Sequence, residues 1–254
     1  MDILIRSTPA EVAIAAADIF VRYANAGATL GLATGSTPVA MYQELTARCE
    51  RGEVSFARSR AFLLDEYVGL DRFHEQSYYS TIRRIFTSHV DFIDELVQSP
   101  EGDAANPDRA AASYDQAIRH AGGIDIQLLG IGGNGHIGFN EPSSSLQSRT
   151  RLETLHPRTV QDNARFFENT DSVPRYALTQ GLGTISEARH LLLLATGTEK
   201  SSAVRDMVEG PLSAHCPASI LQLHPRATVI LDEDAASQLE DYEYYRFVDE
   251  HRPH

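Results

Sequence analysis

The chain has 254 residues and a formal net charge of −13, from 22 Lys and Arg against 35 Asp and Glu. Nucleic-acid binders gain much of their affinity from basic residues that neutralise phosphates, so this balance argues against a nucleic-acid partner. Cys49 and Cys216 stand far apart, without the spacing of a zinc or redox motif. We see neither the pattern of a secretory leader nor an apolar run of membrane-spanning length in the sequence. We therefore expect a cytoplasmic protein that does not bind membranes.

Helices and strands are predicted to alternate along the chain. The first helix opens with a capping pattern, in which Thr8 and Glu11 flank Pro9. Buried strands are expected near residues 28–33, 61–64, 124–129, 189–195 and 227–231, and further helices near 38–49, 77–86, 107–118 and 199–208. This alternation indicates an α/β fold, with a mostly parallel sheet and helices on both faces. We expect a single domain over residues 1–254, with a candidate lid at about 141–176.

Ligands bind such sheets at the carboxyl ends of the strands, so the residues that follow each strand are the candidates for a site. After the first predicted strand, Thr34, Gly35, Ser36 and Thr37 precede a helix that opens at Pro38. Small side chains, hydroxyl groups and a helix N-terminus together are typical of a phosphate cradle. An ordinary helix cap has the same composition, and the lysine of a Walker A loop is absent.

The next two strand ends carry groups that transfer protons. Asp65 follows the second strand, where a carboxylate can act as a general base or simply begin a turn. After the third strand, Asn134, His136 and Glu141 bring an amide, an imidazole and a carboxylate into one glycine-rich turn. An imidazole with polar neighbours is suited to proton transfer near neutral pH. No second His or Cys stands at ligand spacing, so no metal site is expected.

Residues 130–135 (GIGGNG) also match the spacing of a dinucleotide-binding fingerprint. That motif needs a helix to begin at its last glycine and receive the pyrophosphate. Here Gly138 and Pro142 interrupt any helix, so we reject a dinucleotide cofactor. Further along, Arg165 and Lys200 are candidate anion ligands, although charged residues of this kind are also common on protein surfaces.

Together these motifs resemble the glucosamine-6-phosphate deaminase family, also called glucosamine/galactosamine-6-phosphate isomerases. The matching segments, in chain order, are residues 30–38 (LGLATGSTP), 64–70 (LDEYVGL), 135–142 (GHIGFNEP), 148–151 (SRTR), 176–179 (YALT) and 221–225 (LQLHP). The resemblance implies a Rossmann-like sheet and an enzyme of amino-sugar catabolism. Such an enzyme converts glucosamine 6-phosphate and water to fructose 6-phosphate and ammonia, without a metal or organic cofactor.

The resemblance also implies roles for the candidate residues. Asp65 takes the position of the base that moves a proton from C2 to C1 of the sugar. His136 takes the position of the group that opens the pyranose ring, and Asn134 and Glu141 orient it and tune its proton affinity. The positions of the phosphate ligands are taken by Thr34, Gly35, Ser36, Thr37, Arg165 and Lys200.

Two positions depart from the family pattern. Asn134 stands where some members carry Asp, so the imidazolium form of His136 should be less stabilised and the pH profile shifted. Ser144 and Arg151 match a second phosphate site that binds N-acetylglucosamine 6-phosphate in regulated members, but Glu153 replaces a Lys there. An acid would repel phosphate, so we do not expect allosteric activation.

Two alternatives remain. A 6-phosphogluconolactonase shares the architecture and a Gly-His turn, but that family expects a different sequence after His136 than residues 139–142 (FNEP). A sugar-phosphate sensor of a transcription regulator would need a helix-turn-helix module, for which we see no room ahead of the first helix. The expected partner is therefore a small sugar phosphate, and homo-oligomerisation is left open.

Overall fold

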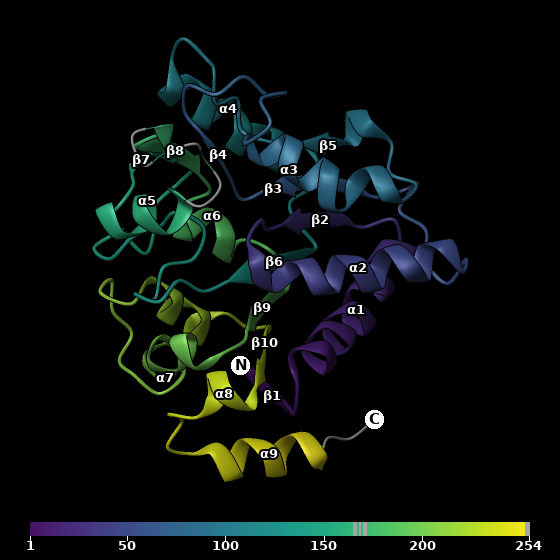
Figure 1. The fold of residues 1–254 in the computed structure, drawn as a ribbon, viewed down its shortest axis with the longest axis vertical. Helices are drawn as coiled ribbons and strands as arrows, with labels where there is room; N and C mark the ends of the chain where they lie inside the picture. The colour runs from purple at the N-terminus through teal and green to yellow at the C-terminus, as the bar shows by residue number, and fades with distance from the viewer. Residues whose placement is uncertain (165–166, 168, 170–171, 252–254) are drawn as a thin grey trace.

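The computed structural model describes residues 1–164, 167, 169 and 172–251. Its centre is a seven-stranded sheet in which every pair of neighbouring strands is parallel (Figure 1). From edge to edge the strands are β1 (Asp2–Arg6), β10 (Ala227–Asp232), β9 (Leu191–Ala195), β6 (Ile126–Gly130), β2 (Thr29–Leu32), β3 (Arg60–Leu63) and β5 (Val97–Gln98). The predicted parallel α/β sheet is confirmed.

Helices cover both faces of this sheet. The helices of the described residues are α1 (Pro9–Asn25), α2 (Ser36–Glu50), α3 (Tyr78–Ile85), α4 (Pro107–His120), α5 (Pro157–Asn163), α6 (Leu182–Ser186), α7 (Ser201–Val208), α8 (Glu233–Ala236) and α9 (Tyr242–Glu250). Figure 1 shows α1 and α2 on one side of the strands and α6 and α7 on the other. The capping expected for α1 is present, because the Thr8 hydroxyl accepts a hydrogen bond from the Glu11 amide. None of the described helices is long and apolar enough to cross a membrane.

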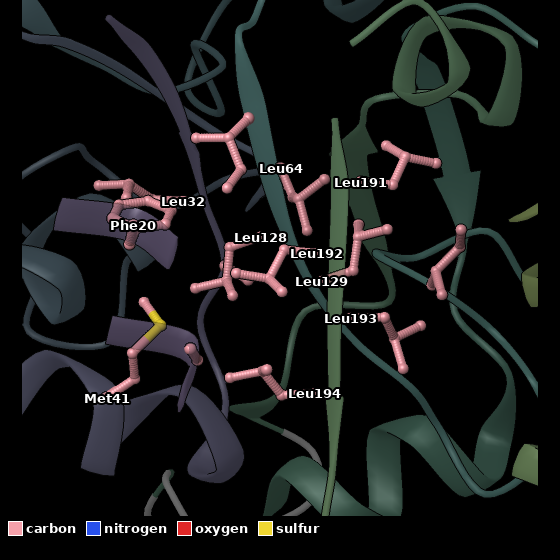
Figure 2. Packing of buried hydrophobic residues seen from close by; sticks show 14 of the residues in the cluster. Phe20, Leu32, Met41, Leu64, Leu128, Leu129, Leu191, Leu192, Leu193 and Leu194 are labelled. Carbon is pink, nitrogen blue, oxygen red and sulfur yellow. The ribbon is translucent and has the colours of Figure 1, made fainter. Parts of the chain in front are cut away.

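The core lies where β6 and β9 pair, and both strands consist almost entirely of buried residues. Leu128 of β6 is the register partner of Leu192 of β9. Figure 2 shows these leucines at the centre of the main apolar cluster, with Phe20 of α1 and Met41 of α2 on one side. Strands that are buried on both faces are nearly continuous runs of aliphatic residues, which is why the sequence predicts them well.

A second, antiparallel sheet was not predicted. It contains β4 (Asp65–Tyr67), β8 (Tyr176–Thr179) and β7 (Arg151–Thr154), with β8 in the middle. Asp65 was expected to follow a strand and begin a turn or a polar loop, but it is the first residue of a new strand and pairs with Thr179. A three-residue strand whose partner lies more than 100 residues away has no local pattern that could reveal it.

The order of the strands changes direction between β2 and β6. The chain continues from β2 to β3 and β5 on one side, and from β6 to β9 and β10 on the other. The loops that leave β2 and β6 therefore diverge at the carboxyl edge of the sheet, which is where parallel α/β sheets bind ligands. Gly31 of β2 allows the close approach of these two strands, because a Cβ atom there would lie 2.1 Å from Gln127 Oε1 of β6.

We expect Gly31→Ala to lower the free energy of unfolding by about 1–3 kcal/mol, because the added methyl group overpacks a fully buried contact. Denaturant unfolding followed by circular dichroism measures this change. Gly130→Ala is the matched control, since a Cβ atom at the end of β6 would meet no atom within 4 Å. Equal midpoints for Gly31→Ala and the unsubstituted chain would show that Gln127 moves away without cost.

Candidate active site

The loop after β6 carries the candidate imidazole. No helix begins in this loop, which is fully described over residues 131–141, so it lacks the helix N-terminus that a dinucleotide fingerprint requires. Gly135 and Gly138 have φ angles of +83° and +56°, which glycine adopts readily. A Cβ atom on Gly132 would lie 2.2 Å from His136 Cε1. The glycines of this motif therefore shape the turn and leave room for the imidazole ring.

Three side chains of this loop form a hydrogen-bonded group. Asn134 Nδ2 donates to Glu141 Oε2 at 2.8 Å, so its Oδ1 is the acceptor for His136 Nδ1 at 2.6 Å. Glu141 Oε2 also lies 3.6 Å from His136 Nδ1. With the hydrogen of the neutral ring on Nδ1, the lone pair is on Nε2, and this nitrogen can accept a proton.

The other oxygen of Glu141 is bound from a different part of the chain. Glu141 Oε1 accepts a hydrogen bond from Thr159 Oγ1 of α5 at 2.6 Å, and one from the His156 amide at 3.3 Å. Burial alone would raise the pKa of Glu141. Hydrogen bonds from His136, Thr159 and Asn134, with the attraction of His136, outweigh burial and lower the pKa to about 2. Glu141 is therefore a carboxylate that stays ionised.

Asp65 faces the same loop from β4. Its side chain is buried, and a Cβ atom on Gly138 would lie 3.4 Å from Asp65 Oδ2. No hydrogen bond to this carboxylate is found in the part of the chain that the structure describes. Burial, and next the negative charge of Glu66, raise the pKa of Asp65 well above its usual range. Asp65 is therefore a much stronger base than an exposed aspartate.

Glu66 has a role that the sequence did not reveal. Its carboxylate accepts hydrogen bonds from the amides of Tyr67, Tyr78 and Tyr79 at 2.8–3.0 Å, and so binds the first turn of α3 to β4. Burial raises the pKa of Glu66 to about 7 even though these amides favour the charged form. Glu66 and Ser77, the N-cap of α3, lie eleven positions apart, and no short motif joins them.

The loop after β2 forms the N-terminus of α2. This helix begins at Ser36, two residues earlier than predicted, and its N-cap is Gly35 with a φ angle of +119°. No side chain of the described chain caps this end, so amides of the first turn remain available to an anion. Thr34 and Thr37 are half-buried, and Ser36 is exposed. Hydroxyl groups and helix amides thus share one turn at the carboxyl edge of the sheet.

Lys200 lies after β9, the neighbour of β6 in the sheet, and is half-buried at the end of a 3₁₀ turn that leads into α7. Both carboxylate oxygens of Asp232, at the end of β10, accept hydrogen bonds from the Gly197 amide at 3.0 Å and so fix the start of this turn. Lys200 is the only lysine among the 254 residues. Arg165, the other predicted anion ligand, lies outside the described residues.

A hollow of about 280 Å³ lies next to Glu141, on the side of β7. Arg151 of β7 donates to Asn140 Oδ1 at 2.8 Å and to Ser144 Oγ at 2.9 Å, and it forms an ion pair with Glu153. The guanidinium group is therefore already paired within the chain. Among the described residues, no three His, Cys, Asp or Glu side chains lie close enough together to hold a metal ion.

Comparisons with known proteins agree with this architecture. Residues 5–230 match the family model of glucosamine-6-phosphate isomerases and 6-phosphogluconolactonases. Across all 254 residues of both proteins, the chain is 76% identical to a glucosamine-6-phosphate deaminase of Corynebacterium aurimucosum. It is 56% identical over 250 residues to the one of Corynebacterium glutamicum, covering 98% of each chain.

Two solved structures share the fold. A monomeric glucosamine-6-phosphate deaminase matches with a TM-score of 0.91 and 41% identity, over 93% of this chain and 99% of the other. The 6-phosphogluconolactonase of Trypanosoma cruzi matches with a TM-score of 0.71 and 23% identity, over 94% and 97%, which is a likeness of fold alone. The chain belongs to the family of glucosamine-6-phosphate isomerases and 6-phosphogluconolactonases.

Proposed function

We propose that Asp65 and the group formed by Asn134, His136 and Glu141 are the acid-base machinery of a glucosamine-6-phosphate deaminase. The proposed reaction converts glucosamine 6-phosphate and water to fructose 6-phosphate and ammonia, and the full-length relatives are named glucosamine-6-phosphate deaminases. One observation carries the assignment of residues: an ionised Glu141 behind the imidazole and a strongly basic Asp65 face one loop at the carboxyl edge of the sheet.

His136 opens the sugar ring. Nε2 takes the proton of the C1 hydroxyl and returns a proton to the ring oxygen, which gives the open-chain aldehyde. The imidazolium that forms in between is stabilised by Glu141, whose Oε2 lies 3.6 Å from Nδ1. Asn134 holds the ring in the tautomer that leaves Nε2 ready to accept a proton.

Asp65 then carries out the isomerisation. Its carboxylate removes the proton from C2 while O1 takes up a proton from solvent, which gives an enolamine. It then returns a proton to C1 while the nitrogen gives one up to solvent, which leaves an imine at C2. Water adds to C2 and ammonia leaves, so that the ketone of fructose 6-phosphate remains. The buried environment that raises the pKa of Asp65 suits it to remove a proton from carbon.

The phosphate group of the substrate binds at the N-terminus of α2. Amides and hydroxyls of residues 34–37, together with Lys200 and Arg165, supply positive potential in a protein whose net charge is −13. The position of Lys200 on the same sheet edge, and its being the only lysine of the chain, support this assignment.

We also propose a lid, a cellular location and independence from an activator. The described part of the candidate lid at residues 141–176 lies against the site, as supported by the contact of Thr159 of α5 with Glu141. The enzyme works in the cytosol, consistent with the free thiols of Cys49 and Cys216. It needs no N-acetylglucosamine 6-phosphate for activity, because Glu153 already pairs with Arg151.

A coupled assay of ammonia release from glucosamine 6-phosphate tests the function. We expect turnover with this substrate and no hydrolysis of 6-phosphogluconolactone. N-acetylglucosamine 6-phosphate should leave the rate unchanged, because the hollow beside Arg151 contains the acid Glu153. Lactone hydrolysis without ammonia release would establish the other activity of the family. Binding of the amino sugar without turnover would indicate a sensor.

We expect Asp65→Asn to lower kcat by about 10²–10⁴-fold, because the amide cannot accept the C2 proton. Deuterium exchange from solvent into C1 should be lost, while the affinity for the sugar phosphate remains. In the unsubstituted enzyme, kcat should fall as the pH drops through the raised pKa of Asp65, hence at a higher pH than for an exposed aspartate. Full turnover of Asp65→Asn would remove Asp65 from the role of base.

We expect Lys200→Ala to raise KM by about tenfold or more, because a charge-assisted contact to the phosphate group is lost. The value of kcat should change little, since the reacting carbons lie at the other end of the sugar. Lys200→Arg, which keeps the positive charge, is the matched control and should recover much of the affinity. An unchanged KM in Lys200→Ala would exclude Lys200 from the phosphate site.

A further inference from the structure

We infer that Thr159 is a positioning residue for ring opening: its hydroxyl sets the Glu141 carboxylate so that Oε2 faces Asn134 and His136. The inference rests on the proposed function of His136 and Glu141. A carboxylate on a single bond to its chain can rotate, and only one of its two oxygens is useful to the imidazole. What fixes the rotation therefore decides whether a carboxylate oxygen faces the imidazole.

The two oxygens of Glu141 have donors from different parts of the fold. Oε2 accepts from Asn134 of the same loop at 2.8 Å, and Oε1 accepts from Thr159 Oγ1 of α5 at 2.6 Å. Hydroxyl-to-carboxylate bonds of this length are among the strong, charge-assisted ones. The second donor to Oε1, the His156 amide, is more distant at 3.3 Å. Of these two donors to Oε1, Thr159 is the closer and therefore the stronger.

Burial makes this bond hard to replace. Thr159 is 6% exposed and Glu141 is 7% exposed, so solvent has little access to the contact. Removing a donor from a buried charged acceptor costs more than removing one at the surface, because water does not take its place. Without the Thr159 hydroxyl, the longer bond to the His156 amide would be the one that Glu141 Oε1 keeps among the described residues.

Helix α5 is itself fixed relative to the base. Asn163 Nδ2, at the end of α5, donates to the Tyr67 hydroxyl at 2.8 Å, and Val160 packs on the cluster that contains Tyr67 and Phe139. Tyr67 is the last residue of β4, and Asp65 is the first. The hydroxyl of Thr159 therefore ties Glu141 to the element that presents Asp65, and so relates the two proton-transfer groups in space.

The charged groups around Glu141 determine the pH at which this carboxylate loses its charge. His136 faces Glu141 from its own loop, and His156 precedes α5. Arg151 and Glu153 of β7 line the hollow on the remaining side and are paired with each other. The hydroxyl of Thr159 helps to lower the pKa of Glu141, so its removal raises that pKa. Glu141 would then lose its charge at a higher pH, while the raised pKa of Asp65 would still set the acid limb of kcat.

The test compares Thr159→Val, which keeps the shape of the side chain and removes the hydroxyl, with Thr159→Ser, which keeps the hydroxyl. We expect Thr159→Val to lower kcat for ammonia release about tenfold, by the loss of one hydrogen bond to a charged group. KM should stay within about twofold. Thr159→Ser should restore kcat. Thr154→Val, at an exposed position at the end of β7, is the matched control and should behave like the unsubstituted enzyme.

Two results would overturn the inference. One is a Thr159→Val enzyme with unchanged kcat; the other is an equal loss in Thr159→Ser, which would make the residue merely structural. A double variant covers the case in which Thr159→Val is poorly folded: in a Glu141→Gln background, Thr159→Val should cause no further loss of kcat. Full activity of Glu141→Gln alone would instead refute the proposed role of Glu141, so the two failures are distinguishable.

Discussion

The parallel order of β9, β6, β2 and β3 is the constraint on which the site depends. Because these four strands are neighbours and run the same way, the loops that follow them meet at one edge of the sheet. Four separate stretches of the chain carry Lys200, His136, the turn at residues 34–37 and Asp65. The sheet alone brings the strands of these stretches together. The antiparallel sheet then adds precision, since β4 aligns Asp65 with the loop of His136.

Within this frame, two carboxylates acquire opposite properties from their surroundings. Asp65 and Glu141 are both buried, and burial alone would raise the pKa of each carboxyl group. Glu141 receives hydrogen bonds on both oxygens and stays ionised, whereas Asp65 has another acid as its neighbour and none of the described donors. A permanent charge suits the stabilisation of an imidazolium, and a strong base suits the removal of a proton from carbon.

Features that depend on residues close together in the sequence could be predicted, and features that depend on distant residues could not. Long aliphatic strands such as β9 and β10 were predicted, because their signal is local, and Asn134 and Glu141 were found because they stand close to His136. The short strands β4 and β5 and the edge strand β1 were missed, since their identity depends on distant partners. Glu66 and Thr159 were missed for the same reason: their contacts join elements that become neighbours only in the folded chain.

Asn134 illustrates how structure changes a conclusion drawn from charge alone. The sequence suggests that an amide at this position leaves the imidazolium of His136 with one negative neighbour fewer. The structure adds that the amide donates to Glu141 while accepting from His136, which an aspartate could not do. An aspartate at this position would bring a second negative charge against Glu141 and raise its pKa. The amide therefore keeps one well-ionised carboxylate 3.6 Å from the ring and fixes the tautomer as well.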